Sequence, residues 1–238
     1  MTSTGRATRW LGAAALLGVA TTVVLGLTLP KTAEQKEYSR LIAIHPPIAW
    51  VFYVSFGVTA LASLLYLWPR TRSRLWDLIA ASSAEISAVF AGLTLVTGSI
   101  WGRPTWGVYW TWDARLTLTA LITAMIVGYL ALRRVPAETE VRSKRSAVSA
   151  VLIALLIPVD HFAVDWWRTL HQDSSLEKAS HALDPSFLAA MGVGFLAFTL
   201  LYAWLLVHRV RLEQLEERLD AEGLELALEE RRAEALVG

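Results

Sequence analysis

Apolar residues fall into six long runs along the chain, separated by short polar and charged stretches. A helix needs about 20 mostly apolar residues to cross the hydrocarbon core of a bilayer. Five runs reach this length easily, whereas the run from Ala147 to about Val164 is weaker, and Pro158 is expected to kink it. The pattern predicts an all-α integral membrane protein with a bundle of six transmembrane helices. The expected spans are 10–29, 47–68, 77–100, 116–132, 147–164 and 186–207.

The first run has features of a signal peptide, since Arg6 and Arg9 precede it. It is longer than the roughly 7–15 apolar residues of a signal peptide, and five further spans follow it. We therefore expect a retained helix, and a single six-helix transmembrane domain over residues 1–238.

Basic residues predict how the bundle is oriented, because they are enriched in cytoplasmic loops. With both termini inside, the segments 30–46, 101–115 and 160–185 lie on the outer face. The cytoplasmic segments then carry more basic residues near the membrane than the outer ones. The cytoplasmic set is Arg6, Arg9, Arg70, Arg72, Arg74, Arg133, Arg134, Arg142, Lys144, Arg145, Arg209 and Arg211, and the outer set is Lys31, Lys36, Arg40, Arg103, Arg115, Arg168 and Lys178.

The last segment, 208–238, is dense in glutamate, arginine and leucine. Its charge pairs four residues apart and its leucine spacing are typical of a surface helix. The sequence predicts a cytoplasmic helical tail, which is either simply solvated or docks a partner.

Composition excludes several function classes. A net charge of +1 gives no general attraction to nucleic acid, and the chain has no cysteine. Disulfides, thiolate metal sites and covalent haem attachment through a Cys-containing motif are therefore excluded. The 55% hydrophobic content agrees with a membrane protein.

The outer segment "WGRPTWGVYWTWD" (101–113) holds four tryptophans in thirteen residues. Tryptophan is enriched at membrane interfaces, but a belt of that kind places single residues at helix ends. Here the rings are concentrated and Gly102, Pro104 and Gly107 are expected to bend the backbone. The segment predicts a shaped apolar surface on the outer face.

Four of the five histidines also fall in outer segments. His45 starts the second span, where two following prolines fit a first helical turn and the helix dipole favours neutral imidazole, the form that ligates metals. If residues 165–171 are helical, Trp167 and His171 share a face. We expect a structural hydrogen bond for His161, and His181 is a rival ligand in a polar loop.

Two imidazoles beside an aromatic surface, without cysteine, predict a flat, apolar, metal-centred ligand held non-covalently. Haem fits this description because histidine is a common axial ligand. Arg103, Arg115 and Arg168 could contact its propionates or a partner. Binding of a bare metal ion fits less well, since no cluster of ligands has metal-site spacing. From the residues alone, the interpretation stops at an aromatic, histidine-bearing site.

The stretch "TGSIWGRPTWGVYWTWDARLT" (97–117) resembles the tryptophan-rich WWD segment of haem-handling proteins of cytochrome c biogenesis. It is most similar to the haem exporter protein C (CcmC) family. "IHPPIAW" (44–50) and "PVDHFAVDWWRTLHQ" (158–172) support this resemblance, which covers residues 40–205.

The resemblance implies a non-enzymatic protein of the cytoplasmic (inner) membrane that binds haem b transiently at the periplasmic face. It would deliver the haem to a membrane-anchored chaperone (CcmE-like), together with ABC transporter subunits (CcmA-like and CcmB-like) and a small single-span protein (CcmD-like). The implied axial ligands are His45 and His171. The expected haem platform is Trp101, Gly102, Trp106, Gly107, Trp110, Trp112, Asp113, Trp166 and Trp167.

Two alternative functions remain at this stage: a haem–cytochrome c ligase of the wider WWD group, or a small-molecule channel or transporter whose tryptophans form a belt. Two residues also keep alternative roles. Asp113 could cap the fourth helix, or could accept a tryptophan N–H or pair with Arg115. Glu85, inside the third span, is expected to pack against hydroxyl groups or to face a water-filled crevice.

Overall fold

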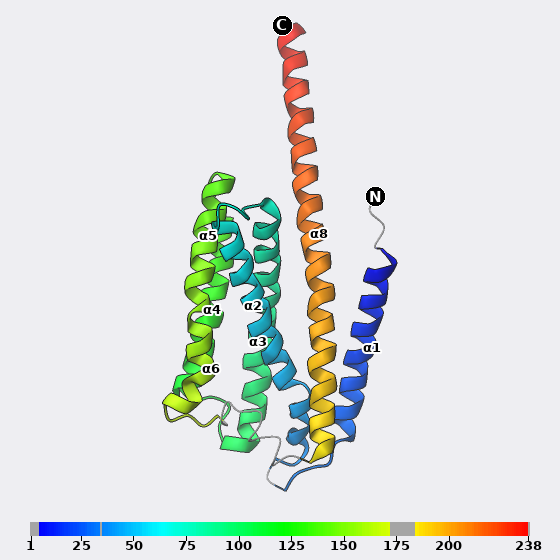
Figure 1. The fold of residues 1–238 in the computed structure, drawn as a ribbon, viewed down its shortest axis with the longest axis vertical. Coiled ribbons are helices and arrows are strands. Elements are labelled where there is room, and N and C mark those ends of the chain that lie inside the picture. The colour runs from blue at the N-terminus through cyan, green and yellow to red at the C-terminus, as the bar shows by residue number, and fades with distance from the viewer. Residues whose placement is uncertain (1–4, 34, 172–183, 238) are drawn as a thin grey trace.

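The computed structural model describes residues 5–33, 35–171 and 184–237, and its regular structure is helical. Six helical segments are long and apolar enough to cross a membrane, which confirms the predicted six-span architecture. They lie side by side as an elongated bundle (Figure 1). The elements are α1 (Arg6–Thr28), a 3-10 helix η1 (Glu37–Ala43), α2 (His45–Leu67), α3 (Arg74–Trp106), α4 (Ala114–Arg134), α5 (Thr139–Ala154), α6 (Leu156–Trp166) and α8 (Pro185–Val237).

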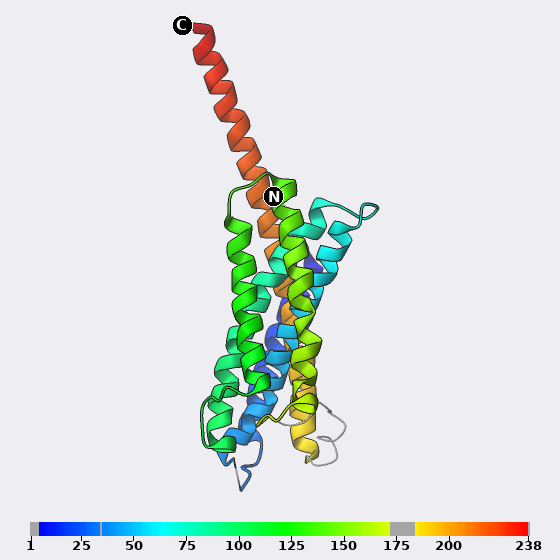
Figure 2. The same ribbon diagram turned by 90° about the vertical axis from the view of Figure 1, so that its left-hand side faces the viewer.

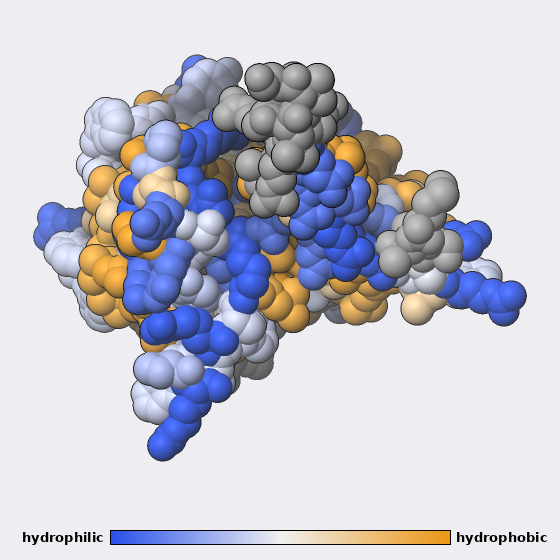
Figure 3. Space-filling model, turned by 90° about the horizontal axis from the view of Figure 1, so that it is seen from above, coloured by the Kyte–Doolittle hydropathy of each residue, from blue (hydrophilic) through white to orange (hydrophobic). Residues whose placement is uncertain are grey.

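The connections divide between the two ends of the bundle. The start of α1 and the end of α8 lie toward one end (Figure 1), where the view from above shows hydrophilic residues among apolar ones (Figure 3). The connections 29–44, 107–113 and 167–171 lie at the opposite end (Figures 1 and 2). We call this the loop end. The six spans therefore bring together the three segments that the sequence places on one face.

The fifth span is broken where the sequence predicts a kink. Helix α5 ends at Ala154 and α6 begins at Leu156. Pro158 has no N–H to donate to the carbonyl of Ala154, four residues earlier, and its ring crowds that carbonyl. The helix is thus interrupted close to Pro158, although the Leu155 backbone stays in the α region (φ −62°, ψ −23°), and α6 leads on to the loop end. The kink itself stays a prediction.

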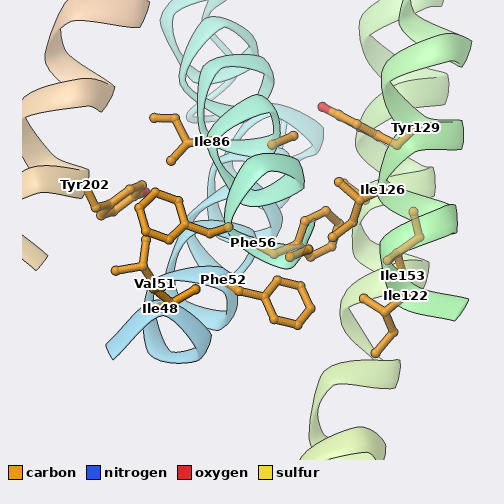
Figure 4. Packing of buried hydrophobic residues seen from close by; sticks show 14 of the residues in the cluster. Ile48, Val51, Phe52, Phe56, Ile86, Ile122, Ile126, Tyr129, Ile153 and Tyr202 are labelled. Carbon is orange, nitrogen blue, oxygen red and sulfur yellow. The ribbon is translucent and has the colours of Figure 1, made fainter. Parts of the chain in front are cut away.

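Helix α2 lies at the centre and packs against α3, α5 and α8. Small residues let α3 approach closely: the Ser83 hydroxyl donates to the Ser55 carbonyl at 2.6 Å and the Ser87 hydroxyl to the Phe52 carbonyl at 3.1 Å. Close approach through small residues is the usual basis of helix packing in membranes. Figure 4 shows the adjoining apolar cluster, which includes Ile48, Val51, Phe52, Phe56, Ile86, Ile122, Ile126, Tyr129, Ile153 and Tyr202.

Helix α1 packs along α8 through glycines. A Cβ atom at Gly12 would lie 2.6 Å from Nε1 of Trp204, and one at Gly18 would lie 2.9 Å from Cβ of Ala197. Real Cβ atoms do not approach other atoms so closely, so both positions depend on glycine. These contacts attach the first span to the last.

Helix α8 continues the last span past the rest of the bundle as one uninterrupted helix (Figures 1 and 2). Ion pairs join the base of this extension to α3: Arg209 binds Glu85, with Nη2 and Oε1 3.1 Å apart, and Arg74 binds Glu217. The expectation that Glu85 packs against hydroxyl groups was wrong, because its carboxylate pairs with an arginine. The alternative, a water-filled crevice, stays a prediction. The arginine lies 124 residues away in sequence, so no local pattern identifies it.

Candidate functional site

His45 is the first residue of α2 and lies against α3 at the loop end. Prolines occupy the next two positions, where the first helical turn does not need their missing N–H groups. The His45 Nδ1 atom lies 2.9 Å from Oγ1 of Thr97. A Cβ at Gly98 would lie only 3.0 Å from Cε1 of His45, so glycine at this position leaves room for the ring.

Trp101 continues the same side of α3 and packs edge-on against the His45 ring, with centroids 5.6 Å apart and an interplanar angle of 75°. Its Nε1 donates to Oε1 of Gln35 at 3.1 Å, and Nε2 of Gln35 donates to the Thr105 hydroxyl at 3.1 Å. Gln35 therefore ties the first connection to the end of α3. No motif in the sequence marks this residue.

The aromatic segment 101–113 is partly helical, so its expected description as a bent connector is wrong for its first half. Residues 101–106 extend α3, and the chain turns at Gly107, whose φ of 80° favours glycine. The Arg103 guanidinium donates to the Gly107 carbonyl and caps the turn. Pro104 lies inside the last turn of α3, where it leaves the Ile100 carbonyl without its N–H donor, and the helix ends two residues later at Trp106.

Trp106 lies between the α3 backbone and the second predicted ligand. A Cβ at Gly102 would lie 2.9 Å from Cε3 of Trp106, so the indole packs directly on the glycine backbone. On its other side, the Trp106 and His171 rings have centroids 5.9 Å apart. Trp101 and Trp106, five residues apart in one helix, thus contact His45 and His171 respectively.

The helical placement of His171 was wrong. Helix α6 ends at Trp166, and Trp167 is extended, with φ −131° and ψ 160°, so Trp167 and His171 do not share a helical face. The N–H of Leu170 donates to Oδ2 of Asp113 at 2.9 Å instead of to a carbonyl four residues earlier. The segment carrying His171 is therefore attached to the aromatic segment.

Asp113 makes this attachment while capping α4. Its Oδ1 accepts the N–H of Leu116 at 2.9 Å, which is an N-cap hydrogen bond. The capping alternative is therefore confirmed, and the remaining oxygen binds Leu170 rather than a tryptophan N–H or Arg115. One carboxylate joins the start of α4 to the segment that holds His171.

Arg115 is occupied by the end of α6. Its Nη1 donates to the carbonyls of Asp160 and His161, both at 2.8 Å, and its side chain is only 14% exposed. The buried Asp160 carboxylate accepts the Tyr53 hydroxyl at 2.5 Å and the Thr119 hydroxyl at 3.1 Å. Because Nε of Arg115 also lies 3.9 Å from Oδ1 of Asp160, this network holds a buried ion pair beneath the loop end.

His161 contributes its backbone carbonyl, which accepts a hydrogen bond from Arg115. Its ring packs edge-on against Tyr53 and Phe162, with centroids 6.3 and 4.9 Å away, and within the described residues its side chain makes no hydrogen bond. The structural hydrogen bond expected for its side chain is therefore absent there, and the His161 carbonyl binds Arg115 instead. His181 lies outside the described residues.

His45 and His171 lie within electrostatic range of one another, and Arg115 is within range of His45. In the described ranges no group of three or more His, Cys, Asp or Glu side chains is placed to hold a metal ion. The loop end therefore offers two imidazoles on an aromatic surface rather than a metal site built wholly from side chains.

Large aromatic side chains remain uncovered around this pair. Trp112 is 76% exposed, and its ring packs at right angles to that of Trp110, 5.4 Å away. The Trp110 Nε1 atom is buried without a hydrogen-bond partner in the described part of the chain. Trp166 and Trp167 are more than half exposed and contact each other, and Arg168 beside them is also exposed. An apolar surface of this kind suits a large flat ligand or a partner.

These features define a helical multi-span membrane protein with a histidine-bearing aromatic site at one end. The family model described as Heme exporter protein C matches residues 1–225. The chain therefore belongs to the haem exporter protein C family of cytochrome c biogenesis, a family of haem-handling proteins rather than classical enzymes.

Relatives with the same description support this assignment. The protein from Bradyrhizobium diazoefficiens is 38% identical over 217 residues, covering 90% of this chain and 81% of the relative. That from Haemophilus influenzae is 36% identical, with 85% and 81% coverage. The Escherichia coli K12 protein is 31% identical, again with 85% and 81% coverage.

Proposed function

We propose that the loop end binds haem b non-covalently, with His45 and His171 as the axial ligands of its iron. The observation that carries this proposal is that both imidazoles pack against tryptophans of one short helical segment, His45 on Trp101 and His171 on Trp106. Haem supplies a flat apolar ring that prefers such a surface and an iron that imidazole binds.

The remaining aromatic residues form the platform of the proposed site, together with Gly102, Gly107 and Asp113. Gly102 allows Trp106 to pack on the backbone, and Gly107 allows the turn into the exposed indoles. The buried Nε1 of Trp110 offers an unused hydrogen-bond donor for a ligand. Trp112, Trp166 and Trp167 supply the uncovered apolar area.

Arginines provide the charge that haem propionates need. Arg168 is exposed and is the most accessible of the three candidates. Arg103 lies at the turn, where it already binds the Gly107 carbonyl. Arg115 is held by two carbonyls of α6 and pairs with the buried Asp160 carboxylate, so it is the least available of the three.

We infer that this haem is cargo. The chain has no cysteine and therefore no thiol with which to form a thioether bond to haem, so the bound haem can leave intact. We propose that it is delivered to a membrane-anchored haem chaperone, with an ABC transporter and a small single-span protein as co-workers, and membership of the haem exporter protein C family supports this. The exposed indoles suit both the haem and a chaperone that approaches it.

The test is to purify the chain after co-expression with the chaperone, and to measure its absorption spectrum and the haem loaded onto the chaperone. A low-spin spectrum with two histidine ligands, and chaperone loading that depends on this chain, are expected. A haem–cytochrome c ligase would instead attach haem to a Cys-containing apocytochrome reporter in cells without the other pathway proteins. That result would overturn the proposal.

The proposal places the loop end on the periplasmic side of the inner membrane. Because the natural chain lacks cysteine, single cysteines can report each face without background. Arg168→Cys is expected to react with a membrane-impermeant maleimide in intact cells, whereas Arg218→Cys in the α8 extension should react only after lysis. The reverse pattern would invert the proposed orientation.

Removing two indoles from the platform should reduce haem loading. The double variant Trp110→Ala, Trp112→Ala loses a pair of packed rings, and each large aromatic side chain contributes roughly 1.5–3 kcal/mol when fully buried by a ligand. We expect at least about a tenfold loss of retained haem, measured by pyridine haemochrome, with normal membrane insertion.

The matched control replaces Trp10 and Trp68, which are 75% and 59% exposed and lie far from the loop end. This control should retain haem as the wild type does. Equal loss in both double variants would point to a general effect of tryptophan on membrane insertion. Normal retention in both would contradict the platform role.

A further inference from the structure

The hydrogen bond between Thr97 and His45 has a definite direction. The Thr97 hydroxyl oxygen lies 2.9 Å from Nδ1 of His45 and 2.7 Å from the carbonyl oxygen of Leu93, one helical turn earlier in α3. A hydroxyl carries a single hydrogen, and a carbonyl can only accept. The short contact with Leu93 therefore takes the hydroxyl hydrogen.

The imidazole must then be the donor toward Thr97. With its hydrogen directed to the Leu93 carbonyl, the hydroxyl oxygen presents a lone pair to His45, and Nδ1 carries the proton. The other nearby carbonyl, that of Thr94 at 3.5 Å, is also only an acceptor and changes nothing in this assignment. Neutral histidine has one N–H, so its Nε2 keeps a free lone pair.

The surroundings of the ring agree with this arrangement. Nε2 has no hydrogen-bond partner in the part of the chain that the structure describes, and the neighbouring Gly98 has no side chain to press on the ring. A Cβ at Gly98 would lie 3.8 Å from both ring nitrogens and 3.0 Å from the carbon between them. Residues 97 and 98 thus hold one edge of the imidazole against α3.

We propose that Thr97 is a positioning residue that fixes His45 in the Nδ1-protonated tautomer and presents Nε2 to the haem iron. This inference rests on the proposed function, since it takes His45 to be an axial ligand. The hydrogen bond that a ligating histidine donates through its other nitrogen orients the ring and raises its basicity. A more basic imidazole stabilises ferric haem more strongly than ferrous haem, so Thr97 lowers the reduction potential of the bound haem.

Threonines in helices often donate to the carbonyl four residues earlier, and several in this chain do so without contacting a histidine. Thr94 donates to the Phe90 carbonyl at 2.8 Å, and Thr123 donates to that of Thr119 at 2.8 Å. Thr97 differs from these threonines because its hydroxyl oxygen also lies within hydrogen-bond distance of Nδ1 of His45. Thr94, one turn away on the same helix, is therefore the matched control.

The test compares Thr97→Val, Thr97→Ser and Thr94→Val with the wild type as purified, haem-loaded proteins. Two readouts are used: the reduction potential, and the rate at which haem passes to excess apomyoglobin. Thr97→Val should retain both axial histidines but show a higher potential and about tenfold faster haem loss. Thr97→Ser and Thr94→Val should behave as the wild type does.

Wild-type potential and release rate in Thr97→Val would overturn the inference. If Thr97→Val does not insert into the membrane, Thr97→Ala provides the same loss of the hydroxyl with a residue that favours helix. Failure of the proposed function gives a different result: His45→Ala would then leave the haem spectrum unchanged, whatever the Thr97 variants show. A changed spectrum in His45→Ala with silent Thr97 variants would overturn the inference alone.

Discussion

Purified His45→Ala protein is expected to lose the low-spin haem spectrum and nearly all of its haem. Removing one of two axial imidazoles leaves iron five-coordinate, which converts the spectrum from low spin to high spin. Partners that only orient a metal ligand are worth about 10–100-fold in affinity, so removing the ligand itself should cost at least about 100-fold. The same result is expected for His171→Ala. Absorption spectroscopy and pyridine haemochrome measure both effects.

Two other histidines provide controls within the same chain. The His161 ring packs against Tyr53 and Phe162, and the His208 ring packs against Trp204 near the base of the α8 extension. His161→Ala and His208→Ala should retain the wild-type spectrum. A wild-type spectrum in both His45→Ala and His171→Ala would contradict the ligand assignment, whereas loss in all four variants would indicate a general folding defect.

Asp113→Asn is expected to bind haem but to release it about tenfold faster than the wild type. Asparagine is as good an N-cap as aspartate, so the hydrogen bond from Leu116 to α4 should persist. Its amide group has only one oxygen, so the second hydrogen bond, from the Leu170 N–H, is lost. A hydrogen bond to a charged group contributes about 1.5–3 kcal/mol, and about 1.4 kcal/mol corresponds to a factor of ten.

The defect should appear in the His171 segment and not in the overall fold. Thermal unfolding in detergent should therefore change little in Asp113→Asn, while haem transfer to apomyoglobin accelerates. Asp113→Ala loses both hydrogen bonds and should show the same release defect together with a lower midpoint of unfolding. An unchanged release rate in Asp113→Asn would show that the bond to Leu170 does not hold His171.

Much of the fold could be predicted because membrane spans leave simple marks. Apolar runs of sufficient length identify the six helices, and Pro158 marks the break in the fifth because a missing N–H has a local consequence. The helical extension of α3 through Trp106 was missed. The sequence predicts bends at Gly102, Pro104 and Gly107. In the structure the first two lie within α3, and the chain turns only at Gly107.

The site could be predicted only in part. His45 and the tryptophans were identifiable from their residue types. Six spans have five connections, and three of these must lie at the end opposite the termini. The details that hold the ligands in place depend on contacts between residues far apart in sequence. Asp113 reaches Leu170 across 57 residues, and Gln35 reaches Trp101 across 66.

The two predicted ligands lie in different structural settings. His45 lies between α2 and α3, where a hydroxyl and a glycine fix its ring. His171 lies on a non-helical segment whose Leu170 N–H donates to Asp113, and the His171 ring packs against Trp106.

The most direct test of the haem site is imidazole rescue of His45→Gly and His171→Gly. In each variant the missing side chain leaves space where free imidazole can bind the iron. If these residues are the axial ligands, adding haem together with imidazole and then removing unbound haem should restore haem binding and the low-spin spectrum in both variants, and should leave the wild-type spectrum unchanged. If imidazole restores neither spectrum while both proteins insert normally and still contain haem, the two histidines are not the ligands and the proposed site is wrong.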